Sequence, residues 1–149
     1  MKIRCINREL TEEQRALLKS PSRFHPNHAL TVGKEYLVLG IVSIIDSPQY
    51  GNTALFEIVN DGGQFVLFPA VLFGVTDARC SSFWRAAVQQ DGTVTLRPEE
   101  FYREFFHDDL SEGDPVARQV FQAVVAKLEA EFSAETSEPA EGGWPRSES

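Results

Sequence analysis

The chain has 149 residues, 42% of them hydrophobic, which is enough for one compact domain with its own core. It contains no apolar run approaching the roughly 20 residues of a membrane-spanning helix, and its first residues, MKIRCINREL, lack the apolar stretch of a secretory signal. Cys5 and Cys80 alone do not make a disulfide framework. We therefore expect a cytoplasmic protein with two free thiols that does not bind a membrane.

The net charge of −8 is concentrated in the C-terminal third of the chain. Residues 1–97 carry 10 Lys and Arg against 9 Asp and Glu, whereas residues 98–149 carry 4 against 13. An acidic surface repels phosphate backbones and favours basic partners, so the composition predicts a protein partner with a basic surface and no nucleic acid. The alternative is that the acidic end lies beside the locally basic residues 1–28 in the fold.

The first predicted elements are a short strand and a short helix. Residues 2–7 alternate polar and apolar side chains, as in a half-buried strand. Thr11 and Gln14 have the spacing of a capping box, which predicts a helix that begins after Thr11. Pro21 predicts the end of this helix, because the residue before a proline avoids the α region.

The central stretch, residues 30–77, predicts antiparallel strands. Turn residues separate three apolar, β-branched and aromatic runs, which are 34–45, 54–59 and 64–68. The turn between the last two runs, Asn60-Asp61-Gly62-Gly63, is a strong hairpin signal. We expect consecutive antiparallel pairing, in a register that buries Phe56 and Ile58 or their alternates.

This stretch resembles the second half of an SH3-like barrel. Two strands joined by a tight turn are followed by FPAVLF, a Pro-led single turn at 68–73, and by GVTD, a short closing strand at 74–77. In that fold a one-turn 3₁₀ helix precedes the last strand. The sequence lacks the acidic loop and paired Trp of peptide-binding SH3 domains. The resemblance therefore implies the barrel architecture and no groove for Pro-rich peptides.

A second hairpin is expected after the barrel. Residues 81–90 and 93–96 flank Asp91-Gly92, a sequence that type I′ turns prefer. The alternation within the second strand predicts that Val94 and Leu96 lie on its buried face.

From Pro98 the apolar period becomes helical, which predicts a first C-terminal helix that extends to about Phe106. Residues 107–114 form an acidic break, after which a wide apolar stripe predicts a second helix up to about Phe132. The polar residues 133–149, which contain Pro and Gly, predict a disordered acidic tail.

Residue spacing argues against several common types of catalytic and ligand-binding site. His25 and His28 offer two imidazoles, but no Cys or carboxylate lies at a usual metal-ligand spacing. The acidic residues 107–114 do not match the ligand positions of a calcium-binding EF-hand loop. The sequence has no phosphate-binding Gly-rich loop, and no nucleophile motif surrounds Cys5, Cys80 or a serine. We therefore predict that the protein is not an enzyme and has no catalytic residue, metal or cofactor.

The candidate partner-binding residues lie in two places. An acidic group surrounds the break between the two C-terminal helices: Glu104, Asp108, Asp109 and Glu112. The fields of these residues add, which speeds association with a basic partner, while the neighbouring Asp114 can cap the second helix. Trp84 and Arg85 are the other candidates, because both residue types are enriched in interfaces. Strand geometry, however, favours the core for one of Phe83 and Trp84.

These patterns predict a single α+β domain over residues 1–132. It comprises a small antiparallel SH3-like barrel up to about residue 97, extended by a hairpin, with two C-terminal helices packed on it. Small size, missing catalytic motifs and concentrated negative charge favour a non-catalytic bacterial protein-binding domain. We expect an acidic inhibitor, similar in kind to immunity proteins that neutralise a toxin. The alternatives are a structural or regulatory accessory module of a phage or mobile-element assembly, and an enzyme with an unrecognised site.

Overall fold

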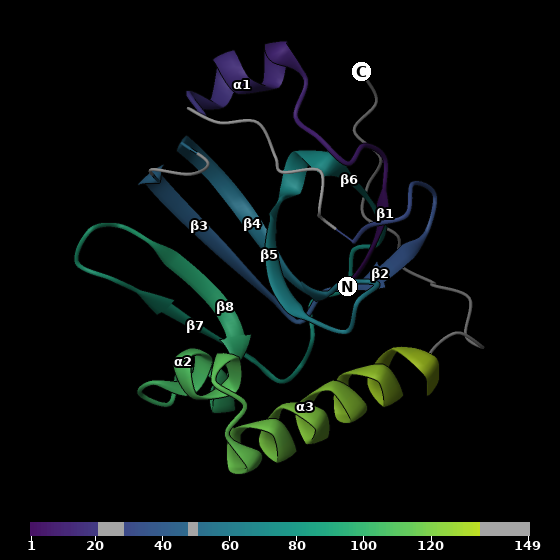
Figure 1. Ribbon diagram of the computed structural model, residues 1–149, viewed down its shortest axis with the longest axis vertical. Helices are drawn as coiled ribbons and strands as arrows, with labels where there is room; N and C mark the ends of the chain where they lie inside the picture. The colour runs from purple at the N-terminus through teal and green to yellow at the C-terminus, as the bar shows by residue number, and fades with distance from the viewer. Residues whose placement is uncertain (21–28, 48–50, 135–149) are drawn as a thin grey trace.

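The computed structural model describes residues 1–20, 29–47 and 51–134. Its elements follow one another along the chain (Figure 1) in the order β1 Lys2–Cys5, α1 Glu12–Leu18, β2 Glu35–Leu37, β3 Gly40–Ser47, β4 Gly51–Val59, β5 Phe65–Pro69, η1 Ala70–Leu72, β6 Phe73–Asp77, β7 Trp84–Val88, β8 Val94–Pro98, η2 Glu99–Tyr102, α2 Phe106–Ser111 and α3 Pro115–Ala134.

The strands form two antiparallel sheets (Figure 1). The smaller sheet has the order β2-β1-β6 and the larger one the order β5-β4-β3-β8-β7. The fold is therefore α+β, as predicted. The described residues contain no closed barrel, so the SH3-like architecture stays a prediction.

The predicted strand 34–45 is divided between the two sheets at Val38 and Leu39. The Val38 N–H donates to the Met1 carbonyl at 3.0 Å, whereas the Leu39 N–H donates to the Glu57 carbonyl, in the larger sheet, at 2.8 Å. Val38 and Leu39 are buried in different clusters. Because consecutive side chains of an extended chain point to opposite faces, a segment that is apolar on both faces contributes to two cores.

Strands β3, β4 and β5 form the predicted antiparallel meander. Ile41 lies opposite Phe56, and Phe56 lies opposite Phe68. Phe56 and Ile58 are both buried, as predicted. The 3₁₀ turn η1 then separates β5 from β6 at the predicted Pro-led turn.

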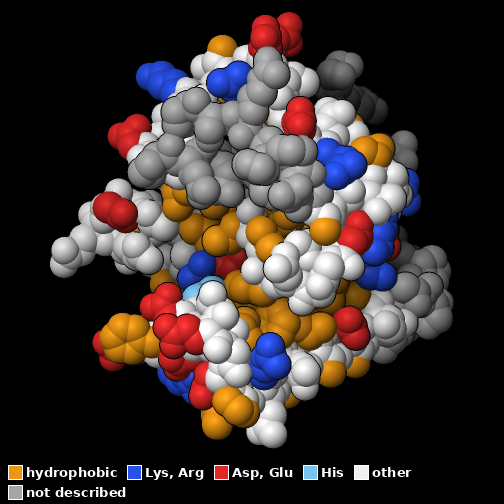
Figure 2. All heavy atoms as spheres, in the orientation of Figure 1, with side chains coloured by type: hydrophobic (Ala, Val, Ile, Leu, Met, Phe, Trp, Pro, Cys, Tyr) orange, Lys and Arg blue, Asp and Glu red, His pale blue; other side chains and the backbone are white. Residues whose placement is uncertain are grey.

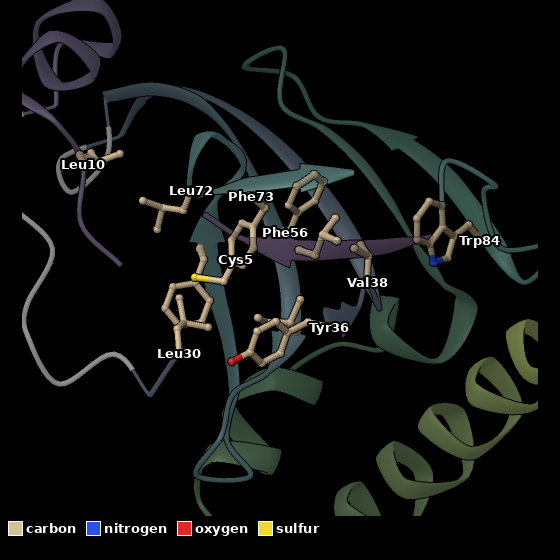
Figure 3. Packing of buried hydrophobic residues seen from close by; sticks show 12 residues of the cluster. Cys5, Leu10, Leu30, Tyr36, Val38, Phe56, Leu72, Phe73 and Trp84 are labelled. Carbon is tan, nitrogen blue, oxygen red and sulfur yellow. The ribbon is translucent and has the colours of Figure 1, made fainter. Parts of the chain in front are cut away.

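The first core lies between the two sheets (Figure 3). The ring of Phe73 meets three others nearly edge-on, with centroid distances of 6.0 Å to Phe56, 6.3 Å to Phe68 and 6.4 Å to Tyr36. The thiol of Cys5 lies in the same cluster, and burial raises its pKa. Edge-to-face aromatic contacts add to the stabilisation that burial itself provides, and the buried members of this core are mainly apolar.

The second core lies on the other face of the larger sheet, beneath η2, α2 and α3. Its buried members are Leu39, Phe101, Phe106, Ala117, Val124 and Leu128. The ring of Phe101 stacks on Phe106 at 5.2 Å and on Phe121 at 6.0 Å. Lys127 of α3 donates to Glu100 of η2 at 2.8 Å. Burial opposes ionisation of Glu100, but this hydrogen bond keeps its pKa below the ordinary value.

The prediction of one continuous first C-terminal helix was wrong. The chain forms the short η2, then a break at Phe105 with a φ of 62°, then α2. The predicted acidic break 107–114 is largely α2 itself. In one continuous helix, Phe101 and Phe106 would point about 140° apart. The break turns both rings into the second core, where they stack.

The β7–β8 hairpin forms as predicted, but its turn differs. Gly92 has a φ of 88°, whereas Asp91 does not have a positive φ. A type I′ turn requires positive φ at both central residues. Instead, the loop is longer, and the Gln89 N–H closes it by donating to the Thr93 carbonyl at 2.8 Å.

The burial of β8 differs in part from the prediction. Thr93 and Thr95 are buried and Val94 is exposed, whereas Leu96 is half-buried and packs against the first core. The element η2 follows β8 and places the Tyr102 hydroxyl 2.9 Å from the Thr95 hydroxyl. This hydrogen bond satisfies the polar atom that burial would otherwise leave without a partner.

The N-terminal predictions were confirmed where the structure describes them. In α1 the Gln14 N–H donates to Thr11 Oγ1 at 3.1 Å and the Thr11 N–H to Gln14 Oε1 at 3.0 Å, which completes the capping box. Cys5 is buried and Cys80 exposed, both as free thiols. No described helix is both long and apolar enough to cross a bilayer. His25, His28 and residues 135–149 of the predicted tail lie outside the described residues. The predicted start of the tail was wrong, because Ser133 and Ala134 belong to the last turn of α3.

Candidate functional site

The residue that precedes helix α2 has an unusual backbone conformation. Phe105 precedes it in the left-handed conformation, with φ 62° and ψ 12°, and its side chain is 65% exposed. A large side chain adopts this conformation at a cost of about 1–2 kcal/mol. The next residue, Phe106, is buried in the second core. The backbone at this point therefore places one ring inside the fold and the neighbouring ring in solvent.

Three carboxylates lie around the exposed ring, and Glu104 precedes it in the sequence. We define the acidic surface as Phe105 with Glu104, Asp108, Asp109 and Glu112. Phe105, Asp108, Asp109, Ser111 and Glu112 line one shallow depression of about 300 Å³. In Figure 2, acidic side chains gather over α2 at the lower left, beside a hydrophobic side chain that stands out from the surface. The structure thus places three of the predicted acidic residues around one depression, with Glu104 adjacent in sequence.

Only one of these carboxylates has an ion-pair partner among the described residues. Arg103 Nη2 lies 3.5 Å from Asp109 Oδ2, and both side chains are more than 40% exposed. The Arg103 guanidinium also lies over the Phe106 ring, 5.5 Å from its centre. Exposed ion pairs of this kind contribute little to stability, and the other carboxylates of the acidic surface have no ion-pair partner among the described residues.

Asp114 has the structural role that the sequence predicted. Its Oδ2 accepts a hydrogen bond from the Ala117 N–H at 2.9 Å, which caps the start of α3. It therefore does not belong to the acidic surface.

The second pair of predicted contact residues is separated by the strand geometry. Trp84 is 8% exposed and belongs to the first core, where its Nε1–H donates to the Leu39 carbonyl at 2.9 Å. Phe83 is exposed and lies under the Lys127 ammonium, 4.5 Å from its ring centre. Arg85 is exposed and donates to the carbonyls of Ser82 and Trp84. Trp84 is thus the core member of the Phe83–Trp84 pair, and its buried indole offers no surface to a partner.

The structure also reveals a cluster of charges that the sequence analysis missed. Glu57 of β4 is 0% exposed. One of its oxygens, Oε1, accepts a hydrogen bond from Arg97 Nε of β8, and the other, Oε2, lies 3.8 Å from Nε2 of His107 in α2. Oε2 and Nε2 are both buried and have no hydrogen-bond partner among the described residues. Two strands and a helix therefore meet at one buried carboxylate.

Gly40 makes room for this cluster. It lies on β3, directly opposite Glu57. A Cβ at this position would approach the Leu96 carbonyl oxygen to 3.0 Å, Arg97 Cγ to 3.1 Å and Glu57 Cδ to 3.3 Å. The absence of a side chain at Gly40 thus allows Glu57 and Arg97 to approach each other closely.

Aromatic rings fix the orientation of the His107 imidazole. Its ring centre lies 5.3 Å from Phe65, 5.7 Å from Phe106 and 6.1 Å from Phe101. The side chain is nevertheless 35% exposed. His107 therefore presents one edge to Glu57 and keeps another part of its surface accessible.

The accessible side of His107 lines a hollow of about 710 Å³ between the β4–β5 hairpin, α2 and α3. The hollow is lined by Gly63, Gln64, Phe65, Val66, His107, Leu110, Ser111, Arg118, Phe121 and Gln122. Figure 2 shows hydrophobic side chains on its floor and the histidine at one edge. Helix α2 thus separates two different surfaces, the acidic surface on its outer side and this hollow on its inner side.

The sequence carried a weak signal for this cluster. Glu57 is the one charged residue in the apolar run 54–59, on the opposite face to Phe56 and Ile58. A charge on an interior strand is rarely buried unless it is paired, but neither Arg97 nor His107 is near it in sequence.

No family model, curated protein or solved structure matches this chain.

Proposed function

We propose that this chain is a non-catalytic protein-binding domain whose acidic surface contacts a basic partner, and that it acts as an inhibitor of the immunity type. The observation that carries the proposal is Phe105, an exposed aromatic ring in a left-handed conformation that shares a depression with three carboxylates. Backbone strain of this kind costs about 1–3 kcal/mol and clusters at functional sites. Aromatic residues are enriched in the centres of interfaces.

The charges around Phe105 suit recognition of a positively charged protein. Complementary charges mainly raise the rate of association, and their effect falls as salt increases. A central apolar side chain then contributes affinity by leaving water. The combination fits a partner with a small apolar pocket inside a Lys- or Arg-rich surface.

The order of elements supports a related proposal for residues 30–77. The meander β3–β4–β5, the 3₁₀ turn η1 and the short strand β6 follow one another as the SH3-like resemblance implies. We propose that this segment has SH3-like architecture and serves as the frame that carries the C-terminal helices.

The experiment is a binding comparison with matched variants. The test variant carries Asp108→Asn, Asp109→Asn and Glu112→Gln, which keep the side-chain shapes and remove three charges. The control carries Glu9→Gln, Glu13→Gln and Glu129→Gln, exposed residues outside the acidic surface. Phe105→Ala is the third variant. The partner to test first is the product of the neighbouring gene, expressed alone for growth inhibition and then together with this chain.

The wild type and the control are expected to bind the partner and to restore growth. The test variant should associate about tenfold more slowly at low salt and show a flatter salt dependence. Phe105→Ala should instead raise the dissociation rate, because most interface mutations act there. Equal association rates for the test variant and the wild type at every salt concentration would refute the proposed surface. A neighbouring product that does not inhibit growth would refute the immunity role.

A further inference from the structure

The hollow on the inner side of α2 has the size and composition of a small-molecule site. Ligand sites usually measure about 300–1,000 Å³ and combine apolar walls with a few convergent polar groups. Here Phe65 and Phe121 supply apolar walls, with ring centres 5.3 Å apart. Gln64, Arg118 and Gln122 bring polar groups from a turn and from α3. The groups therefore converge from separate parts of the chain.

The charge of the hollow is opposite to that of the protein. The chain has a net charge of −8, but no Asp or Glu is among the described residues that line the hollow. The charged side chain that lines it is Arg118, which has no hydrogen-bond or ion-pair partner among the described residues. Its guanidinium lies near Gly113, with Nη2 3.7 Å from the position of a Cβ there. An unpaired guanidinium beside an apolar wall is suited to bind a carboxylate.

His107 lines the same hollow with its accessible side. Its buried Nε2 lies 3.8 Å from Glu57 Oε2, a separation too long for a hydrogen bond, and both atoms lack a hydrogen-bond partner among the described residues. A ring nitrogen of an imidazole can donate a hydrogen bond, so the accessible edge of His107 can bind an anion in the hollow together with Arg118.

We propose that this hollow binds a small organic carboxylate, with the carboxylate group on Arg118 and His107 and the apolar part of the molecule against Phe65 and Phe121. The carboxylate comes either from a free small acid or from the C-terminus of a peptide, since both present the same group beside an apolar body. This inference does not rest on the acidic surface, which lies on the other side of α2.

The test is an NMR titration of the full chain with matched probes. The small acid is 3-phenylpropionate and its neutral control is 3-phenylpropionamide. The peptide probes are acetyl-Ala-Ala-Phe with a free C-terminus and the same peptide as its amide. Ligands of this size are expected to bind with a Kd in the millimolar range. Both carboxylates should shift the signals of Gln64, Arg118 and Gln122, whereas the amides should not. Binding of the peptide acid alone would identify a peptide C-terminus as the ligand.

Two variants locate the carboxylate. Arg118→Gln should weaken binding about tenfold, because it removes a charge-assisted hydrogen-bond pair. Arg4→Gln removes the same charge from an exposed position on β1 and should leave the affinity unchanged. The variant with Asp108→Asn, Asp109→Asn and Glu112→Gln should also bind the probe within about twofold of the wild type. Failure of the acidic surface and failure of the hollow are therefore distinguishable.

Substitution tests the role of His107. His107→Ala should weaken 3-phenylpropionate binding, because it removes a hydrogen-bonding group that lines the hollow. Equal binding of acid and amide, an unchanged affinity in Arg118→Gln, or no saturable shift with either carboxylate would overturn the proposal.

Discussion

The two cores of this protein contain similar aromatic side chains but have different surroundings. The first core, between the sheets, packs Phe56 and Phe68 edge to face on Phe73 among other buried apolar side chains. The second core also contains stacked phenylalanines, but it adjoins the buried charge of Glu57 and opens into a hollow at Phe121.

Under the two proposals made above, this difference separates stability from binding within one small domain. A closed apolar core contributes stability in proportion to the area removed from water. A core with a buried carboxylate at its edge gives up part of that stability, because desolvating a charge is costly even when it is paired. Such a cost is expected where a surface is kept for a partner or ligand. We therefore expect variants of the first core to affect folding alone and variants of the second to affect folding and binding together.

The largest effect is expected from Phe68→Ala in the first core. Phe68 is fully buried, and removal of a buried phenylalanine typically destabilises a protein by about 3–5 kcal/mol. Phe83→Ala is the matched control, because Phe83 lies at the surface and is 37% exposed; it should cost less than about 1 kcal/mol. Urea unfolding of the full chain measures both. Equal losses for the two variants would contradict the assignment of the first core.

Glu57→Gln should be the next largest change, at the edge of the second core. It leaves Arg97 beside an uncharged partner, and breaking a buried ion pair costs about 3–5 kcal/mol. We expect a loss of about 2–4 kcal/mol, because the Arg97 side chain is 17% exposed and keeps some contact with water.

A double-mutant cycle sharpens this prediction. Arg97→Met combined with Glu57→Gln should lose less stability than the sum of the single variants, because the double variant leaves no unpaired charge between the two positions. Additive losses would mean that Glu57 and Arg97 do not stabilise each other.

Phe121→Ala tests how open the second core is. A fully buried position would lose about 3–5 kcal/mol, but Phe121 is half-buried and lines the hollow, so a loss of about 1–3 kcal/mol is expected. The same variant should also weaken 3-phenylpropionate binding, since it removes an apolar wall. A loss below about 1 kcal/mol would mean that α3 packs only loosely on the sheet.

The smallest effect concerns a carboxylate of the smaller sheet. Hydrogen bonds from the Arg79 side chain lower the pKa of Asp77 from 3.8 to about 2. Because the folded state depresses this pKa, Asp77 stabilises the protein above about pH 4, and that contribution is lost as pH falls toward 2. Asp77→Asn should cost about 1 kcal/mol at neutral pH, because Arg79 is substantially exposed. Acid unfolding curves of variant and wild type should converge near pH 2, and a constant offset would argue against the ion pair.

Local patterns in the sequence determined many of the elements. The alternation of apolar residues predicted the meander and the burial of Phe56 and Ile58, because side chains of a strand alternate between faces whatever covers them. The capping residues Thr11 and Asp114 were also predictable, since a cap acts within one turn of its helix. These features need only neighbours in the chain.

Only the tertiary structure decided which face of each element is covered and which distant residues meet. The division of the strand at Val38 and Leu39, the burial of Thr95 in place of Val94, and the break at Phe105 all depend on elements that pack from elsewhere in the chain. The meeting of Glu57 with Arg97 and His107 depends on pairing across strands and on the placement of α2. Periodicity describes one element at a time, whereas a buried charge is explained only by the partners that the complete fold brings to it.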